Sequence, residues 1–248
     1  MNNDIATQTY WKNVWNQYRY ISKFDKNYYT NSLLDGLFKK YLPKDKTKEI
    51  CEIGCALSPY LLYFHDEFEY QINGFDYDKN AVEKTKEIYL KLGYDANIYY
   101  HDFFDSPKEQ YNILFSMGVF EHFKNLDSCI EHTLDYLKEE GYIVTIIPNM
   151  NGIVGFLQKL LNKKVYDIHI PYTKEDILHA HKKSGYKTLF CDYFGVYQGG
   201  VINIMDLKYK NIISKLLAVP GKPLFYLNKI LAIDSKMNSP YIVYIGKK

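Results

Sequence analysis

Apolar and polar residues alternate along this chain in a repeating order of strands and helices. Short apolar runs rich in β-branched and aromatic residues predict strands, and segments with apolar residues three and four apart predict helices. The predicted strands are 49–53, 70–76, 97–101, 111–116, 142–147, 186–194 and 241–245. Helices are predicted over 59–64, 80–92, 125–139 and 173–184. This alternation indicates a Rossmann-like α/β fold, with a doubly wound, mostly parallel seven-stranded sheet and helices on both faces.

Two segments fall outside this alternation. The N-terminal arm, residues 1–45, is helical in character and carries Trp11, Trp15 and the single arginine of the chain, Arg19. Either the arm packs on the domain through its tryptophans, or it closes over a ligand pocket where Arg19 binds a carboxylate or phosphate. Residues 151–172 interrupt the pattern and are predicted to form a lid insert. We expect one domain over 1–248, with its binding core at 46–150 and the last helices and strands at 173–248.

Composition narrows the class of protein. With 248 residues and 47% hydrophobic content, the chain can bury one sizeable core. A net charge of +2 gives no strong electrostatic field, so we expect a small-molecule partner and no nucleic acid. No apolar run is long enough for a transmembrane helix. The polar N-terminus and four cysteines without a pairing or metal-ligand spacing predict a cytoplasmic protein with no metal site. The pattern of segment 212–233 predicts two short amphipathic helices, and this segment is the candidate surface for a homodimer.

The stretch from Lys48 to Phe64 holds the clearest local signal. Its apolar strand ends in Glu52, a turn of small residues follows from Gly54, and a helical pattern comes next. Small residues let a turn approach a ligand closely, and the start of a helix offers free N–H groups. Asp76 and Asp102 end the next two predicted strands, and the carboxyl ends of parallel strands meet at one edge of a sheet. The sequence therefore predicts a ligand site at that edge.

The motifs EIGCALS, GFDYD, HDFF, FSMGVFEHF and EEGYIVTIIPN, in this order and spacing, resemble those of class I S-adenosylmethionine-dependent methyltransferases. The resemblance implies S-adenosylmethionine as the cofactor. It also implies that Asp76 binds the ribose and Asp102 the adenine amino group. The other residues that it places at the cofactor are Glu52, Gly54, Cys55 and Ala56 around the methionine part, Tyr77 and Phe103 beside the adenine ring, and Ser116 and Met117 near the sulfonium. Ala56 and Ser58 stand where the family usually has glycines.

Candidate acceptor-side residues follow the fourth strand and the insert. His122 is a candidate catalytic residue, as a general base or by orienting the acceptor, although it would also suit a bracing role in its loop. His169 and Tyr172 are expected to line an acceptor pocket, whereas His179 and His181 are expected on the surface. The acceptor is predicted to be an oxygen of a sugar, a nucleotide-linked molecule or a phosphorylated metabolite. The general layout loosely resembles methyltransferases of bacterial surface-polysaccharide pathways.

Two other classes of function remain open at this stage. Ala56 and Ser58 would suit a methyltransferase-fold partner subunit with weak catalysis, although Glu52, Gly54, Asp76 and Asp102 argue against it. A nicotinamide-dependent oxidoreductase would also have a strand, a glycine turn and a ribose-binding acid. Its fingerprint needs a third glycine for close helix packing, and the chain supplies none after Ser58.

Overall fold

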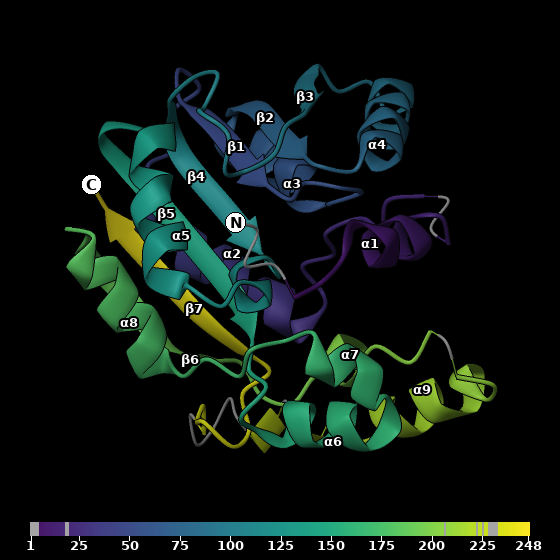
Figure 1. Cartoon of the computed structure of the whole chain (residues 1–248). Helices are drawn as coiled ribbons and strands as arrows, with labels where there is room; N and C mark the ends of the chain where they lie inside the picture. The colour runs from purple at the N-terminus through teal and green to yellow at the C-terminus, as the bar shows by residue number, and fades with distance from the viewer. Residues whose placement is uncertain (1–4, 18–19, 206, 222, 225, 228–232) are drawn as a thin grey trace.

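A seven-stranded sheet forms the centre of the molecule, with strand order β3-β2-β1-β4-β5-β7-β6 (Figure 1). The computed structural model describes the whole chain except residues 1–4, 18–19, 206, 222, 225 and 228–232. Only β7 runs antiparallel to its neighbours, so the predicted mostly parallel, seven-stranded sheet is confirmed. The strands are β1 Glu49–Ile53, β2 Gln71–Asp76, β3 Ala96–Tyr100, β4 Tyr111–Met117, β5 Leu137–Pro148, β6 Lys187–Phe194 and β7 Tyr241–Lys247.

Helices cover both faces of this sheet, as the sequence predicts. One apolar core joins the sheet to α2 (Tyr29–Tyr41), α3 (Tyr60–Phe68) and α4 (Lys79–Lys91). A second core on the opposite face joins it to α5 (Leu126–His132) and α8 (Lys174–Lys183). Side chains that alternate along the central strands enter these two cores in turn, because successive residues of a strand point to opposite faces.

Strand β5 begins five residues earlier than the sequence predicts, and the preceding helix is correspondingly shorter. The predicted helix 125–139 is α5 followed by a 3-10 turn, Thr133–Tyr136. Leu137 already pairs with Tyr111 of β4, and the register shifts before the next pair. Glu140 has a positive φ of 62° within this bulge. Strand pairing across the sheet therefore overrides the local helical pattern.

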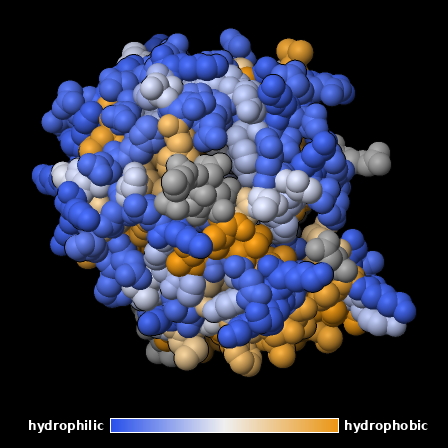
Figure 2. Space-filling view, viewed as in Figure 1, coloured by the Kyte–Doolittle hydropathy of each residue, from blue (hydrophilic) through white to orange (hydrophobic). Residues whose placement is uncertain are grey.

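The segment 151–172 forms two helices, α6 (Ile153–Leu161) and α7 (Lys163–Asp167), which lie with α9 (Lys210–Ala218) below the sheet in Figure 1. A small apolar cluster around Val154, Tyr197, Ile202 and Ile204 joins α6 to α9. Their outer faces expose further apolar side chains, seen as the orange area at the lower edge of Figure 2 and including Phe156, Leu160, Ile212 and Leu216. The second helix predicted within 212–233 lies partly outside the described residues. None of the described helices is both long and apolar enough to cross a membrane.

His181 lies in the core, so its predicted surface position is wrong, whereas His179 is exposed as expected. The His181 ring stacks on Tyr244 with centroids 3.7 Å apart. Its Nδ1–H donates to the carbonyl oxygen of Ile177 at 2.7 Å, and Nε2 accepts from the Thr145 hydroxyl at 3.1 Å. Burial lowers the pKa of His181 to about 3, so the ring is neutral in the folded protein.

Replacing His181 with Phe should weaken the dependence of the free energy of unfolding on pH under acidic conditions. The folded-state pKa of His181 lies below its value in the unfolded chain, so its contribution to stability is present above pH 6.5 and is lost as the pH falls towards 3. Wild-type protein should lose up to about 1.4 kcal/mol per pH unit more than His181→Phe across this range. Denaturant unfolding at several pH values measures the difference. His179→Phe is the control, and equal slopes for all three proteins would contradict the prediction.

Candidate functional site

A cleft of about 800 Å³, including its open mouth, lies at the carboxyl ends of β1, β2 and β4. Among the residues predicted to bind the cofactor, those that line this cleft are Gly54, Asp76, Tyr77, Asp102, Phe103 and Met117. They come from four different loops of the sheet edge, which only the fold brings together. His122 lines the cleft as well. Glu52, Cys55, Ala56 and Ser116 are buried behind its wall.

The turn after β1 is held in a tight conformation. Gly54 has a φ of +69°, and a Cβ at this position would lie 2.9 Å from Cγ2 of Val119. The backbone N–H groups of Gly54 and Cys55 both donate to the carbonyl oxygen of Phe75, at 2.9 and 3.1 Å. Glycine is required here because other residues rarely adopt this backbone conformation and because the space is already filled. Ala56 is accommodated at the next small position, where its N–H donates to Oδ2 of Asp76 at 3.3 Å.

Two carboxylates face the cleft from β2 and from the loop after β3. Asp76 is 5% exposed, and its Oδ1 accepts the backbone N–H of Asp78 at 2.9 Å. Burial raises the pKa of Asp76 to about 6, even though the N–H groups of Asp78 and Ala56 act to lower it. Asp102 is half-buried and accepts the backbone N–H of Phe104 at 3.0 Å. Each carboxylate keeps acceptor capacity for a ligand, because the described donors do not fill all four of its lone-pair positions.

Glu52 and Ser116 carry buried oxygen atoms, Oε2 and Oγ respectively, that have no hydrogen-bond partner among the described residues. Burial raises the pKa of Glu52 to about 8, and the negative charge of Asp76 adds to this effect. Unpaired polar atoms are uncommon in protein interiors because each costs free energy. Such atoms, in strands β1 and β4 that lead to the cleft, are more common near binding sites than in a purely structural core.

The N-terminal arm, and not the insert, forms the outer wall of the cleft. Trp11 and Trp15 of α1 (Gln8–Trp15) line it, with their rings stacked at a centroid distance of 5.7 Å. Nε2 of Gln8 donates to the carbonyl oxygen of Tyr77 at 3.0 Å, which ties α1 to the loop after β2. Among the described residues, the cleft lining contains none from 151–172. Arg19 lies outside the described residues.

His122 meets a histidine from the insert. It lies in a 3-10 turn after β4, and its ring centroid is 4.6 Å from that of His169 and 5.1 Å from that of Trp11. Burial, and next the neighbouring His169, lower the pKa of His122 to about 3. Tyr172 lies away from the cleft lining and donates its hydroxyl to the carbonyl oxygen of Phe123 at 2.7 Å. Tyr172 thus braces the loop that carries His122.

Glu121 is the residue at this site that the sequence analysis did not single out. Its side chain is 1% exposed, and its Oε1 lies 3.7 Å from Nε2 of His122. Burial raises the pKa of Glu121 to about 8. The signal available in the sequence was its position next to His122, in the short segment that follows the apolar strand 111–116. The loops after parallel strands form the functional edge of such a sheet.

Residues 25–189 match the model of a family described as a methyltransferase domain. The chain belongs to this family. It is an S-adenosylmethionine-dependent methyltransferase domain, as the order of its motifs implies, and the match disfavours the nicotinamide-dependent alternative. A comparison with curated proteins found no match.

Solved structures share the methyltransferase fold at low sequence identity. Geranyl diphosphate C-methyltransferase from Streptomyces coelicolor A3(2) matches with a TM-score of 0.61 and 11% identity, over 95% of each chain. Phosphoethanolamine N-methyltransferase 2 from Haemonchus contortus has a TM-score of 0.62 and 15% identity over 88% of this chain and 52% of that one. The [4+2]-cyclase SpnF matches with a TM-score of 0.58 and 14% identity over 88% of this chain and 80% of that one. At such identities the likeness shows the fold alone.

Replacing Gly54 with Ala should weaken cofactor binding and destabilise the methyltransferase. The positive φ alone costs roughly 1–2 kcal/mol for an L-residue, and the new methyl group would press on Val119. We expect S-adenosylhomocysteine to bind at least about tenfold more weakly, measured by calorimetry.

Gly36→Ala provides a matched control for this substitution. Gly36 lies within α2, and a Cβ there meets no atom within 4 Å. That variant should gain about 0.8–1 kcal/mol of stability from helix propensity and keep its affinity. Unchanged affinity in Gly54→Ala, in a folded protein, would contradict a role for the turn as the cofactor cradle.

Proposed function

We propose that this protein transfers the methyl group of S-adenosylmethionine to an oxygen atom of a small molecule. The observation that carries the proposal is the cleft itself, where Gly54, Asp76 and Asp102 meet His122 from the other side. The first three residues suit the cofactor, and His122 suits the acceptor. Their convergence in one cleft supports a cofactor site next to an acceptor site.

The residues of the cleft fit S-adenosylmethionine in charge and shape. Asp76, which ends β2, would accept hydrogen bonds from both ribose hydroxyls, and Asp102 would accept one from the adenine amino group. The rings of Tyr77 and Phe103 supply apolar surface beside the adenine. Glu52 does not line the cleft, but its Oε2, unpartnered among the described residues, would attract a ligand's ammonium group held at the neighbouring Gly54 turn. When bound, the cofactor supplies a methyl group on a positively charged sulfur.

The protein's own part in the reaction would be to orient the acceptor and exclude water. A methyl sulfonium is already activated, so the main requirement is an acceptor atom held in line at close distance. His122 lies in the cleft wall with Trp11 against its ring, and Nδ1–H is committed to the carbonyl oxygen of Ile168 at 2.6 Å. Nε2 therefore keeps its lone pair, which would accept a hydrogen bond from an acceptor hydroxyl. The tryptophans of α1 would shield the reacting atoms.

An aromatic cleft whose described lining residues include no lysine or arginine supports a small acceptor. The relatives named above are called geranyl diphosphate and phosphoethanolamine methyltransferases, so this fold accommodates small phosphorylated molecules. A sugar, nucleotide-linked or phosphorylated acceptor therefore stays our proposal, and a role in surface-polysaccharide synthesis is a narrower prediction within it. A homodimer through the segment 212–233 is likewise a prediction.

Asp76→Asn tests the cofactor site with almost no change in shape. The variant keeps one acceptor oxygen but loses the charge that strengthens hydrogen bonds to the ribose. We expect S-adenosylhomocysteine to bind at least about 100-fold more weakly, equivalent to about 2.7 kcal/mol. Calorimetry on the purified protein measures it. Asp66→Asn, an exposed change on α3, is the control. Equal affinities of the two variants for S-adenosylhomocysteine would show that Asp76 does not contribute to cofactor binding.

Methyl transfer is tested separately, with methyl-labelled cofactor and a panel of hydroxyl and amine acceptors. Wild-type protein should release S-adenosylhomocysteine only with acceptors that carry a hydroxyl, and Asp76→Asn should lose this activity in proportion to its affinity. Turnover of amines alone would overturn the choice of oxygen. Tight cofactor binding without turnover of any acceptor would favour the partner-subunit alternative.

A further inference from the structure

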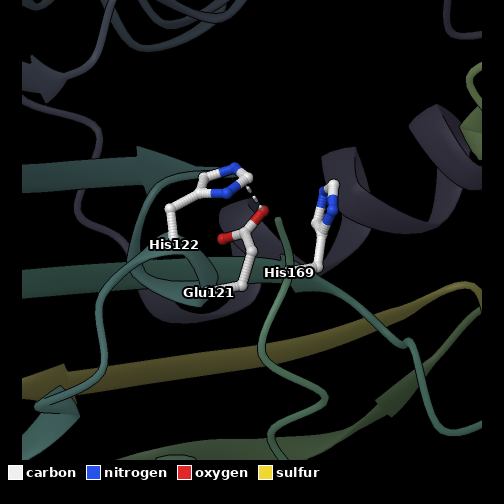
Figure 3. Close-up of side chains that lie close together, drawn as sticks. All are labelled: Glu121, His122 and His169. Atoms are coloured by element: carbon white, nitrogen blue, oxygen red, sulfur yellow. Dashed lines mark ion pairs between the residues drawn. The ribbon is translucent and has the colours of Figure 1, made fainter. Parts of the chain in front are cut away.

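Glu121, His122 and His169 form a compact cluster of three metal-ligating side chains (Figure 3). Glu121 and His122 belong to the turn after β4, whereas His169 follows α7 in the insert. One candidate ligand atom from each residue lies within 4.8 Å of the other two. Figure 3 shows the Glu121 carboxylate rising between the two imidazole rings. The fold thus brings together ligands from segments far apart in the sequence.

Hydrogen bonds fix both imidazole rings in the same tautomer. Nδ1–H of His122 donates to the carbonyl oxygen of Ile168, and Nδ1–H of His169 donates to that of Val165, both at 2.6 Å. Each ring therefore keeps a lone pair on Nε2. Histidines that bind metals in proteins almost always donate their other N–H to a carbonyl or carboxylate in this way. The partners that would orient two histidine ligands are already in place.

One oxygen at the centre of this cluster has no donor in the described part of the chain, although the backbone N–H of Glu121 acts on its own carboxyl group. Oε2 of Glu121 is buried without a hydrogen-bond partner, and the ion pairs of the described residues give Glu121 no lysine partner. Oε1 of Glu121 and Nε2 of His122 are 3.7 Å apart, which is too far for a shared proton to form a hydrogen bond. The unpartnered carboxyl oxygen and the two Nε2 lone pairs lie close together, an arrangement that suits a bound cation.

We propose that Glu121, His122 and His169 bind a divalent transition-metal ion of the zinc type. Two imidazoles and one carboxylate favour such an ion over magnesium or calcium, which prefer ligand sets made of oxygen. Zinc bonds of 2.0–2.1 Å place tetrahedral ligands roughly 3.3 Å apart, so the side chains would need to approach by at most roughly 1.5 Å. This proposal differs from the sequence-based expectation of no metal site. That expectation rested on cysteine spacing, which gives no information about an acid and two histidines that only the fold brings together.

The ion would have two consequences beyond the proposed methyl transfer. It would link the insert to the turn after β4, because His169 and the Glu121–His122 pair come from these two elements. It would also border the cleft, since His122 lines it. Three protein ligands leave a tetrahedral ion one open position, where an acceptor oxygen would be able to coordinate. The acceptor-side role of His122 would then act through the ion.

Metal titration of the purified, chelator-treated chain tests this site without cofactor or acceptor. We expect one zinc ion per chain by calorimetry, and a visible absorption band on Co²⁺ addition that is typical of a nitrogen- and oxygen-ligated site of low coordination number. Glu121→Gln and His169→Gln should each lower the affinity at least roughly 100-fold, because each removes a ligand while keeping side-chain size. His179→Gln, an exposed histidine on α8, should bind as the wild type does.

Thermal unfolding provides the second readout and shows whether each variant folds. Zinc at a concentration well above its dissociation constant should raise the melting temperature of the wild type and of His179→Gln by roughly 5 °C or more, and should leave Glu121→Gln unchanged. Absence of saturable binding in the wild type would overturn the proposal. So would equal binding by the wild type, folded Glu121→Gln and folded His169→Gln, which would indicate a surface site. Neither result depends on methyl transfer, so the metal site and the proposed methyltransferase function are tested independently.

Discussion

The reversal of strand order at β1 is the constraint on which the rest of the structure depends. From β1 the chain builds outwards through β2 and β3, then returns to place β4 on the other side of β1. The helix after β1, α3, packs on one face of the sheet, and the helix after β4, α5, packs on the opposite face. The loops that follow β1 and β4 therefore diverge, and a crevice opens between them at the carboxyl edge. The cleft occupies this crevice, so its position follows from topology before any side chain is considered.

This crevice concentrates ionisable groups that would be costly elsewhere. Glu52, Asp76 and Glu121 are each at most 5% exposed, and burial raises the pKa of each carboxyl. Structural stability alone would favour apolar side chains at such positions, because unpaired buried charges lower the free energy of unfolding. Strongly shifted carboxyls grouped around one cleft are typical of functional sites. The two apolar cores on the faces of the sheet supply the stability that lets this edge remain polar.

Local signals in the sequence predicted most of the fold, whereas long-range contacts decided what they missed. Signals between neighbouring residues predicted three features: the Gly54 turn, the strand ends at Asp76 and Asp102, and the start of α8 at the capping box of Thr173 and Asp176. The early start of β5 depends on pairing between Leu137 and Tyr111 across the sheet. The burial of His181 depends on stacking with Tyr244, which a helical pattern cannot reveal. The approach of His169 to Glu121 depends in the same way on the path of the insert.

The turn after β4 is held from two sides, and this decides which part of the cleft wall opens most easily. Ile170 of the insert donates its N–H to the carbonyl oxygen of Glu121 at 2.7 Å, and Ile5 donates to that of His122 at 2.9 Å. Helix α1, in contrast, has no fully buried residue, and its ties to the loop after β2 and to α4 include two hydrogen bonds, to Tyr77 and from Lys84. Hydrogen bonds of this kind contribute only about 1 kcal/mol each. The turn differs from α1 in burial, because Phe120, Glu121 and His122 are all buried, so displacing α1 exposes less of the protein interior than displacing the turn.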